Sequence, residues 1–152
     1  EVIAIGEIRD ADTMRTVISA AETGHLIIGT MHASSAYQAI DRILAQSGPD
    51  SHLVAQMLAN NLLCVLAQNL IPAKDTSEAD PKRVLCYEAL FRSKELAQML
   101  LSSHLNGQGL TPARIRELIQ TGGGIDWNGC LDELVQRDQI LAEDAAALKL
   151  LE

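Results

Sequence analysis

The sequence predicts an α/β protein in which a partial sheet is followed by a helical region. Two apolar runs without alternation, residues 2–5 and 26–31, flank a segment with helical periodicity. Such runs are typical of parallel strands that are covered on both faces. The last third of the chain carries apolar residues three and four positions apart, which is the pattern of amphipathic helices. Only one Trp, two Tyr and one Phe occur, so aliphatic side chains must form most of the core.

Composition limits the class of protein. The 152 residues are 47% hydrophobic and 21% charged, which describes one globular domain with a core of its own. The net charge of −8 has the wrong sign for a domain that binds nucleic acid by neutralising phosphates, so no nucleic-acid partner is expected, although the composition leaves room for a small basic site. The longest apolar run, residues 62–67, is too short for a membrane helix. Three cysteines without a C-x-x-C pair are interpreted as reduced core residues of a cytosolic protein.

The first thirty residues predict a strand, a helix and a second strand. Residues 2–6 form the first strand, and Asp10 offers an N-cap for a helix over residues 11–23. Gly24 ends this helix, and residues 26–31 form the second strand. Since the first residue is Glu1 and an apolar run follows at once, we expect the chain to be a fragment of a longer protein.

The lengths of these elements predict a βαβ unit. A helix of about thirteen residues rises roughly 20 Å, which matches a strand of about six residues at roughly 3.3 Å each. The right-handed crossover then places the carboxyl ends of both strands at one edge of the sheet, where open α/β sheets bind ligands. Glu7 follows the first strand and His32 the second. We therefore expect an acid and an imidazole to face one crevice, on strands that are adjacent or separated by one other.

The remainder of the chain continues with a helix, a hairpin and a group of helices. Ser35 and Gln38 predict a capping box for the next helix. The apolar stripe of residues 53–66 predicts a core helix, and the polar residues 74–82 predict a hairpin loop before a strand over 83–90. Four further helices are expected over residues 92–103, 112–121, 127–137 and 142–151.

Two longer motifs resemble one known family. Residues 5–10 (IGEIRD) and 22–32 (ETGHLIIGTMH) resemble the atypical Walker B motif and the histidine box of the secretion and type IV pilus ATPases, the PilT/GspE-like motors. Further similarity extends through residues 41–43, 84–90, 118–122 and 131–140, less specifically in the middle and tail of the chain. The resemblance implies the C-terminal half of a RecA-like core over residues 1–91 and a helical subdomain over 92–152.

The resemblance also implies roles for individual residues. Glu7 matches a glutamate that positions or activates the water attacking the γ-phosphate, and His32 matches a residue that contacts the γ-phosphate region or senses hydrolysis. Gly6 stands where many other NTPases carry the aspartate that binds magnesium, so no metal ligand is assigned. Arg9, Asp10 and Thr30 join Gly6 as expected nucleotide-binding residues, with Arg9 paired to Asp10 or to a neighbouring acid.

The family further implies a cytoplasmic homo-hexamer, peripheral at the inner membrane, that uses ATP and Mg²⁺ and works with platform proteins of a pilus or secretion apparatus. No G-x-x-x-x-G-K-[ST] motif occurs, and the glycine cluster 122–124 follows a predicted helix and is interpreted as its stop. We therefore expect the isolated chain to lack ATPase activity. The subfamily stays open, because residues 93–98 (SKELAQ) differ from the AIRNLI motif of retraction motors and no tetracysteine zinc element is present.

Two alternatives remain beside the motor ATPase. If the chain is not part of a motor ATPase, we expect a non-catalytic interaction or pseudoenzyme module of the same apparatus. A metal site built from His25, His32 and Glu7 is disfavoured, because His25 begins the strand that His32 follows, roughly 20 Å away at the rise of a strand.

Overall fold

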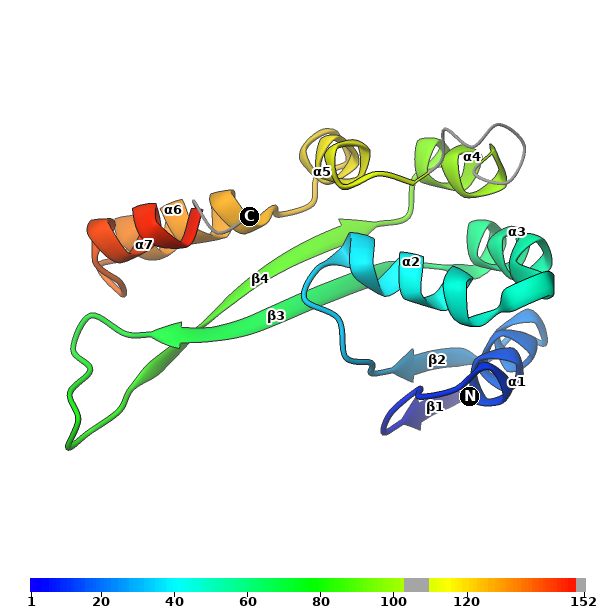
Figure 1. Cartoon of the computed structure of the whole chain (residues 1–152), viewed down its shortest axis with the longest axis horizontal. Helices are drawn as coiled ribbons and strands as arrows, with labels where there is room; N and C mark the ends of the chain where they lie inside the picture. The colour runs from blue at the N-terminus through cyan, green and yellow to red at the C-terminus, as the bar shows by residue number, and fades with distance from the viewer. Residues whose placement is uncertain (103–109, 150–152) are drawn as a thin grey trace.

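The computed structural model of the chain describes residues 1–102 and 110–149. It opens with the predicted βαβ unit: strand β1 (Val2–Ile5), helix α1 (Ala11–Glu22) and strand β2 (Leu26–Gly29). The two strands are adjacent and parallel, with Val2 opposite Leu26 (Figure 1). Asp10 caps α1 as expected, since its Oδ1 accepts the backbone N–H of Thr13 at 2.8 Å. After α1, Gly24 has a φ of 92°, a conformation that glycine adopts without strain.

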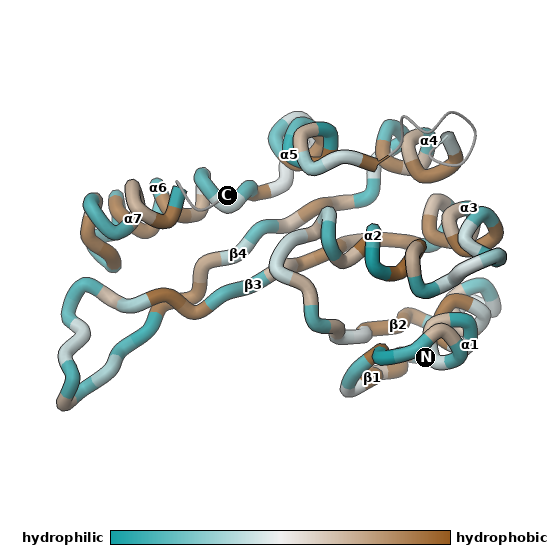
Figure 2. Tube along the Cα trace, in the orientation of Figure 1, coloured by the Kyte–Doolittle hydropathy of each residue, from teal (hydrophilic) through white to brown (hydrophobic). Residues whose placement is uncertain are grey.

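The β1–β2 pair differs from the prediction in its burial. Both strands were expected to be covered on both faces, yet Val2, Leu26 and Ile28 are 64%, 44% and 56% exposed. Neither of the two hydrophobic clusters of the described residues includes a residue of β1 or β2, although β2 is coloured as apolar in Figure 2. The apolar run predicted the strands correctly, but the described part of the chain does not supply the second layer that would bury them.

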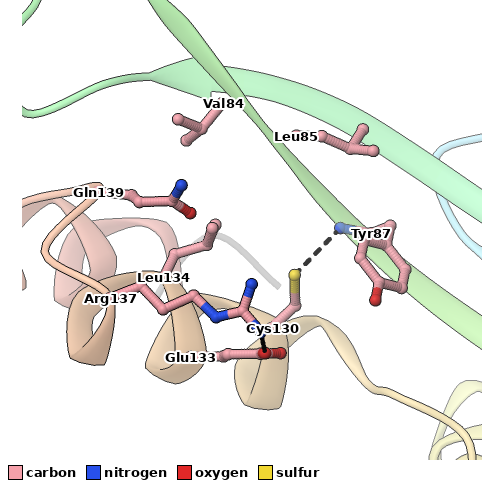
Figure 3. A pocket seen from close by; sticks show the side chains of 8 residues that line it. All are labelled: Val84, Leu85, Tyr87, Cys130, Glu133, Leu134, Arg137 and Gln139. Atoms are coloured by element: carbon pink, nitrogen blue, oxygen red, sulfur yellow. Dashed lines mark hydrogen bonds and ion pairs between the residues drawn. The ribbon is translucent and has the colours of Figure 1, made fainter.

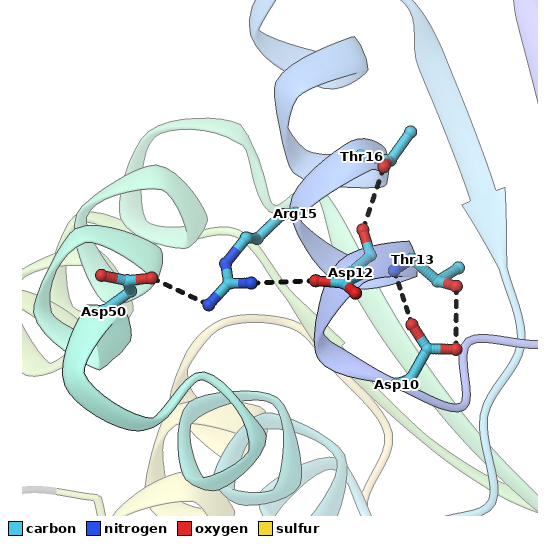
Figure 4. A network of polar contacts seen from close by, with 6 residues as sticks. All are labelled: Asp10, Asp12, Thr13, Arg15, Thr16 and Asp50. Atoms are coloured by element: carbon cyan, nitrogen blue, oxygen red, sulfur yellow. Dashed lines mark hydrogen bonds and ion pairs between the residues drawn. The ribbon is translucent and has the colours of Figure 1, made fainter.

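Three helical segments follow β2: α2 (Ala36–Gln46), the short 3₁₀ turn η1 (Gly48–Asp50) and α3 (Ser51–Asn61). A polar network joins this region to α1 (Figure 4). In it the Arg15 guanidinium contacts Asp12 at 3.0 Å and Asp50 at 2.9 Å. Because these groups are exposed, the network contributes little to stability. It does show that this side of α1 lies next to η1.

Strands β3 (Cys64–Pro72) and β4 (Arg83–Phe91) form a long antiparallel hairpin. The prediction of a helix extending to residue 66 was therefore wrong, because α3 ends at Asn61 and the chain is extended from Leu62. Residues 64–66 fit both a helical stripe and a strand, and pairing with β4 decides between them. Cys64, expected in the core, is exposed, whereas Cys86 and Cys130 are buried. The polar loop predicted between the strands is confirmed.

The C-terminal part consists of α4 (Lys94–Ser102), α5 (Pro112–Thr121), α6 (Trp127–Gln136) and α7 (Ala142–Lys149). All four predicted helices are present, while their predicted extensions to Ser103 and to residues 150–151 lie outside the described residues. Within the described part of the chain, none of the helices is both long and apolar enough to cross a membrane.

Two hydrophobic clusters hold these elements together. The first joins α1, α2, α3 and the end of β4 to α4 and α5, and includes the fully buried Ile40, Leu90 and Leu100. The second lies farther along the hairpin, where Ile71 and Cys86 contact residues of α6 and α7. Because both clusters contain residues from each side of position 91, the division into residues 1–91 and 92–152 stays a prediction.

Candidate functional site at the carboxyl ends of β1 and β2

Glu7 and His32 meet where β1 and β2 end, as the strand order predicted. Nε2 of His32 lies 3.1 Å from Oε1 of Glu7. The other carboxylate oxygen, Oε2 of Glu7, lies 2.5 Å from a guanidinium nitrogen of Arg9. Arg9 therefore pairs with Glu7 and not with Asp10. An acid, an imidazole and a guanidinium thus occupy one edge of the parallel pair.

The segment after β1, which carries Glu7, and the segment after β2, which carries His32, are joined by hydrogen bonds. The N–H of Ile8 donates to the carbonyl of Thr30 at 2.8 Å, and the Thr30 hydroxyl donates to the carbonyl of Gly6. A Cβ at Gly29 would lie 2.6 Å from Cδ1 of Ile8, so any other residue there would push the end of the Ile8 side chain aside. Gly6 and Thr30 therefore hold the spacing between the Glu7 and His32 loops.

The charges around Glu7 favour its ionised form. The hydrogen bond from Arg9 is the main cause that lowers the pKa of Glu7 below its ordinary 4.5, and the charges of Arg9, His32 and Arg42 act in the same direction. The same hydrogen bond raises the pKa of Arg9. Glu7 is thus a carboxylate at neutral pH, able to accept a hydrogen bond from water but not to donate one.

The His32 loop is held mainly through its backbone. The His32 side chain is 84% exposed, so packing does not orient it. Instead, a guanidinium nitrogen of Arg42 in α2 donates to the His32 carbonyl at 2.9 Å. No sequence pattern predicts this role of Arg42, because a contact ten residues back along the chain leaves no periodic signal.

Asp10 and His25 are occupied by structural contacts. Both carboxylate oxygens of Asp10 accept from Thr13, through its N–H and its hydroxyl, and these bonds lower the pKa of Asp10. His25 lies at the opposite end of β2, where its Nδ1 is 3.2 Å from the carbonyl of Ala20. It does not approach the Glu7–His32 pair, and the described residues contain no group of three potential ligands arranged around a metal.

A profile of the family described as "Type II/IV secretion system protein" matches residues 1–113. The chain belongs to this family. It is 31% identical over 149 residues to the type IV pilus retractation ATPase PilT of Pseudomonas aeruginosa, a match that covers 95% of this chain and 40% of that protein. It is 32% identical over 106 residues to the type II secretion system ATPase E of Vibrio cholerae, covering 66% of this chain and 19% of that protein.

Solved structures agree with this assignment to the secretion family. The pilus retraction motor PilT with bound ADP superposes with a TM-score of 0.75 at 30% identity, covering 95% of this chain and 38% of that one. The Yersinia pseudotuberculosis ATPase DotB superposes with a TM-score of 0.80 at 21% identity, covering 99% of this chain and 37% of that one, which is evidence for the fold. The partial RecA-like fold is thereby confirmed, and the chain spans about two fifths of the length of PilT and DotB.

Proposed function

We propose that the chain acts as the C-terminal part of a motor ATPase that powers a type IV pilus or type II secretion apparatus. In this proposal the longer protein hydrolyses ATP with Mg²⁺, assembles as a homo-hexamer in the cytoplasm and works against inner-membrane platform proteins. Residues 1–91 complete its RecA-like core and residues 92–152 form a helical subdomain. Membership in the secretion family and similarity to proteins named as pilus and secretion ATPases support this proposal.

The observation that carries the proposal is the ionised Glu7 beside His32 at the carboxyl edge of the sheet. Phosphoryl transfer is catalysed chiefly by placing the nucleophile and stabilising charge. The Glu7 carboxylate accepts a hydrogen bond from the attacking water and thereby orients it. Arg9 holds that carboxylate in place from the other side.

His32 is the group that we assign to the γ-phosphate. Its exposed imidazole is able to donate a hydrogen bond to a phosphate oxygen, and its backbone is fixed by Arg42. Because ADP lacks that oxygen, the contact exists only in the triphosphate state. His32 therefore favours ATP over ADP and reports hydrolysis.

The residues present fit one side of a bound nucleotide. Glu7, His32 and the joined loops of Gly6 and Thr30 suit the γ-phosphate end, with Arg9 and Asp10 holding the turn after β1. Mg²⁺, when bound, would neutralise charge on the phosphates. Gly6 brings no side chain, so its position would offer a bound metal no side-chain ligand. The uncovered apolar faces of β1 and β2 fit a sheet whose remaining layers belong to the longer protein.

Replacing Glu7 tests the proposed function directly. In the full-length ATPase that carries this chain, Glu7→Gln should lower phosphate release by at least about a hundredfold, because the amide keeps the shape but loses the charge that orients water. Affinity for ATP should remain close to that of the unchanged protein. Glu78→Gln, in the exposed β3–β4 loop, is the matched control. Near-normal turnover in Glu7→Gln would reduce Glu7 to an ordinary residue of the turn. Absence of phosphate release from the unchanged full-length protein would support the non-catalytic module.

A further inference from the structure

Glu88 in β4 contacts the first turn of α2, 52 residues earlier in the chain. Its carboxylate accepts the backbone N–H of Ala36, the first residue of α2. Ala36 is completely buried, so water cannot replace this acceptor in the described structure. A carboxylate at a helix N-terminus is also favoured by the helix dipole. Glu88 therefore fixes the start of α2 to the hairpin.

The start of α2 carries the His32 loop. Ser35 caps the helix, because its hydroxyl oxygen accepts the N–H of Gln38 at 3.1 Å. The expected capping box is completed differently: the Gln38 side chain accepts from the hydroxyl of Ser34 at 2.8 Å instead of reaching back to Ser35. Arg42 of α2 also donates a hydrogen bond to the His32 carbonyl. These three hydrogen bonds therefore connect α2 to residues 32–35. A shift of α2 would consequently move His32 relative to Glu7.

The same part of β4 forms hydrogen bonds on its other side with α6 and with the segment just before α6. The N–H of Tyr87 donates to Sγ of Cys130 in α6 at 3.4 Å (Figure 3). The N–H of Ala89 donates to the carbonyl of Ile125 at 2.8 Å, and the N–H of Ile125 returns a bond to Ala89 at 3.3 Å. Since backbone groups of alternate residues point the same way along a strand, the N–H groups of Tyr87 and Ala89 both point toward α6 and the residues before it, while the Glu88 carboxylate reaches α2.

We propose that Glu88 is a positioning residue for His32, linking the γ-phosphate contact to strand β4 through the first turn of α2. The inference rests on the proposed function, because it assumes that His32 contacts the γ-phosphate. Glu88 touches no nucleotide itself. It sets where His32 lies, and β4, which is bonded to Cys130 of α6 on its other side, is the support for this contact.

The alternative is that Glu88 only stabilises the fold, and a comparison of three variants separates the two. Glu88→Ala removes the acceptor for the Ala36 N–H. Glu88→Gln restores an acceptor oxygen without the charge. Ala145→Gly in α7, a buried residue of the second cluster, lowers stability because glycine disfavours helices, and it leaves α2 untouched.

The experiment measures the ratio of ATP to ADP affinity and the melting temperature in the full-length ATPase, with His32→Ala as the reference. Glu88→Ala should lower the ratio about five- to tenfold, the scale of a coupling carried by one charged hydrogen bond. Glu88→Gln should stay within about twofold of the unchanged protein. Ala145→Gly should lower the melting temperature and leave the ratio unchanged. In the 152-residue chain, amide exchange at Ala36 should accelerate in Glu88→Ala and not in Ala145→Gly.

The outcomes distinguish the two levels of the proposal. If His32→Ala lowers the ratio and Glu88→Ala does not, the positioning role is overturned and the proposed function stands. If neither variant changes the ratio, the role of His32 fails, and the positioning role fails with it. An equal drop in Ala145→Gly would show that general destabilisation causes the effect, which also overturns the inference.

Discussion

The two sheets in the described part of the chain differ in what they carry: one holds the candidate reactive side chains, and the other holds buried residues of the core. The parallel β1–β2 pair carries Glu7 and His32 at its carboxyl edge, yet Val2 and Ile28 on its strands are more than half exposed. The antiparallel β3–β4 hairpin carries no residue assigned to the reaction, yet Leu90 and Cys86 on β4 belong to the two clusters that hold the helices. Correct placement of reactive side chains therefore needs the register of the short parallel pair, while the buried contacts that stabilise the fold lie among the helices and between them and the hairpin.

Core substitutions should show the largest difference between the sheets. Leu90→Ala should lower the free energy of unfolding by about 2–5 kcal/mol, because it removes a fully buried side chain and leaves a cavity. Ile28→Ala should cost about 1 kcal/mol or less, since the side chain is 56% exposed. Urea unfolding of the 152-residue chain measures both.

Equal losses for the two variants would contradict this comparison, because they would mean that the face of β2 is covered in solution. In the full-length ATPase, Ile28→Ala should become as costly as a core substitution if the longer protein buries that face. This second measurement compares the cost of the same substitution in the 152-residue chain and in the full-length ATPase.

The two histidines that flank β2 sharpen the comparison within the parallel pair. His32→Ala should lower the ratio of ATP to ADP affinity by about tenfold and leave the melting temperature nearly unchanged, because the side chain is 84% exposed and its proposed contact exists only with ATP. His25→Ala should lower the melting temperature and leave the affinity ratio unchanged, since His25 forms hydrogen bonds with Thr23 and with the carbonyl of Ala20. Calorimetric titration together with thermal unfolding separates the two. A lowered melting temperature with an unchanged ratio in His32→Ala would make it a structural residue.

The smallest effect concerns the Glu7–Arg9 pair. Arg9→Gln should raise the pKa of Glu7 toward 4.5, because it removes the main cause of the lowering. Since the pKa of Glu7 is lower in the folded state, the ionised pair stabilises the fold above the unfolded pKa, and this contribution is lost as the pH falls through the folded pKa. NMR titration of the Glu7 carboxyl between pH 2 and 6 checks the direction. Lys82→Gln, remote in the hairpin loop, is the control and should leave that pKa unchanged.

Local sequence predicted the elements of the first thirty residues and the meeting of Glu7 with His32. The apolar runs, the Asp10 cap and the crossover rule were sufficient, because the first two are local signals and the third applies to elements that follow one another directly along the chain. The same kind of pattern failed at residues 64–66, where apolar spacing fits a helix and a strand equally. There, pairing with residues 89–91 of β4 decided the outcome, and no local pattern reports a partner some twenty-five residues away.

By itself, the sequence determined the βαβ order, the caps and the residues that stand at the carboxyl edge. Only the tertiary structure decided that Arg9 pairs with Glu7, that Arg42 holds the carbonyl of His32 and that Glu88 reaches Ala36. The physical reason is range: strand and helix preferences and caps arise from neighbours along the chain, which the sequence displays. Ion pairs and buried acceptors between distant segments depend on where packing places whole elements, and that placement exists only in the folded molecule.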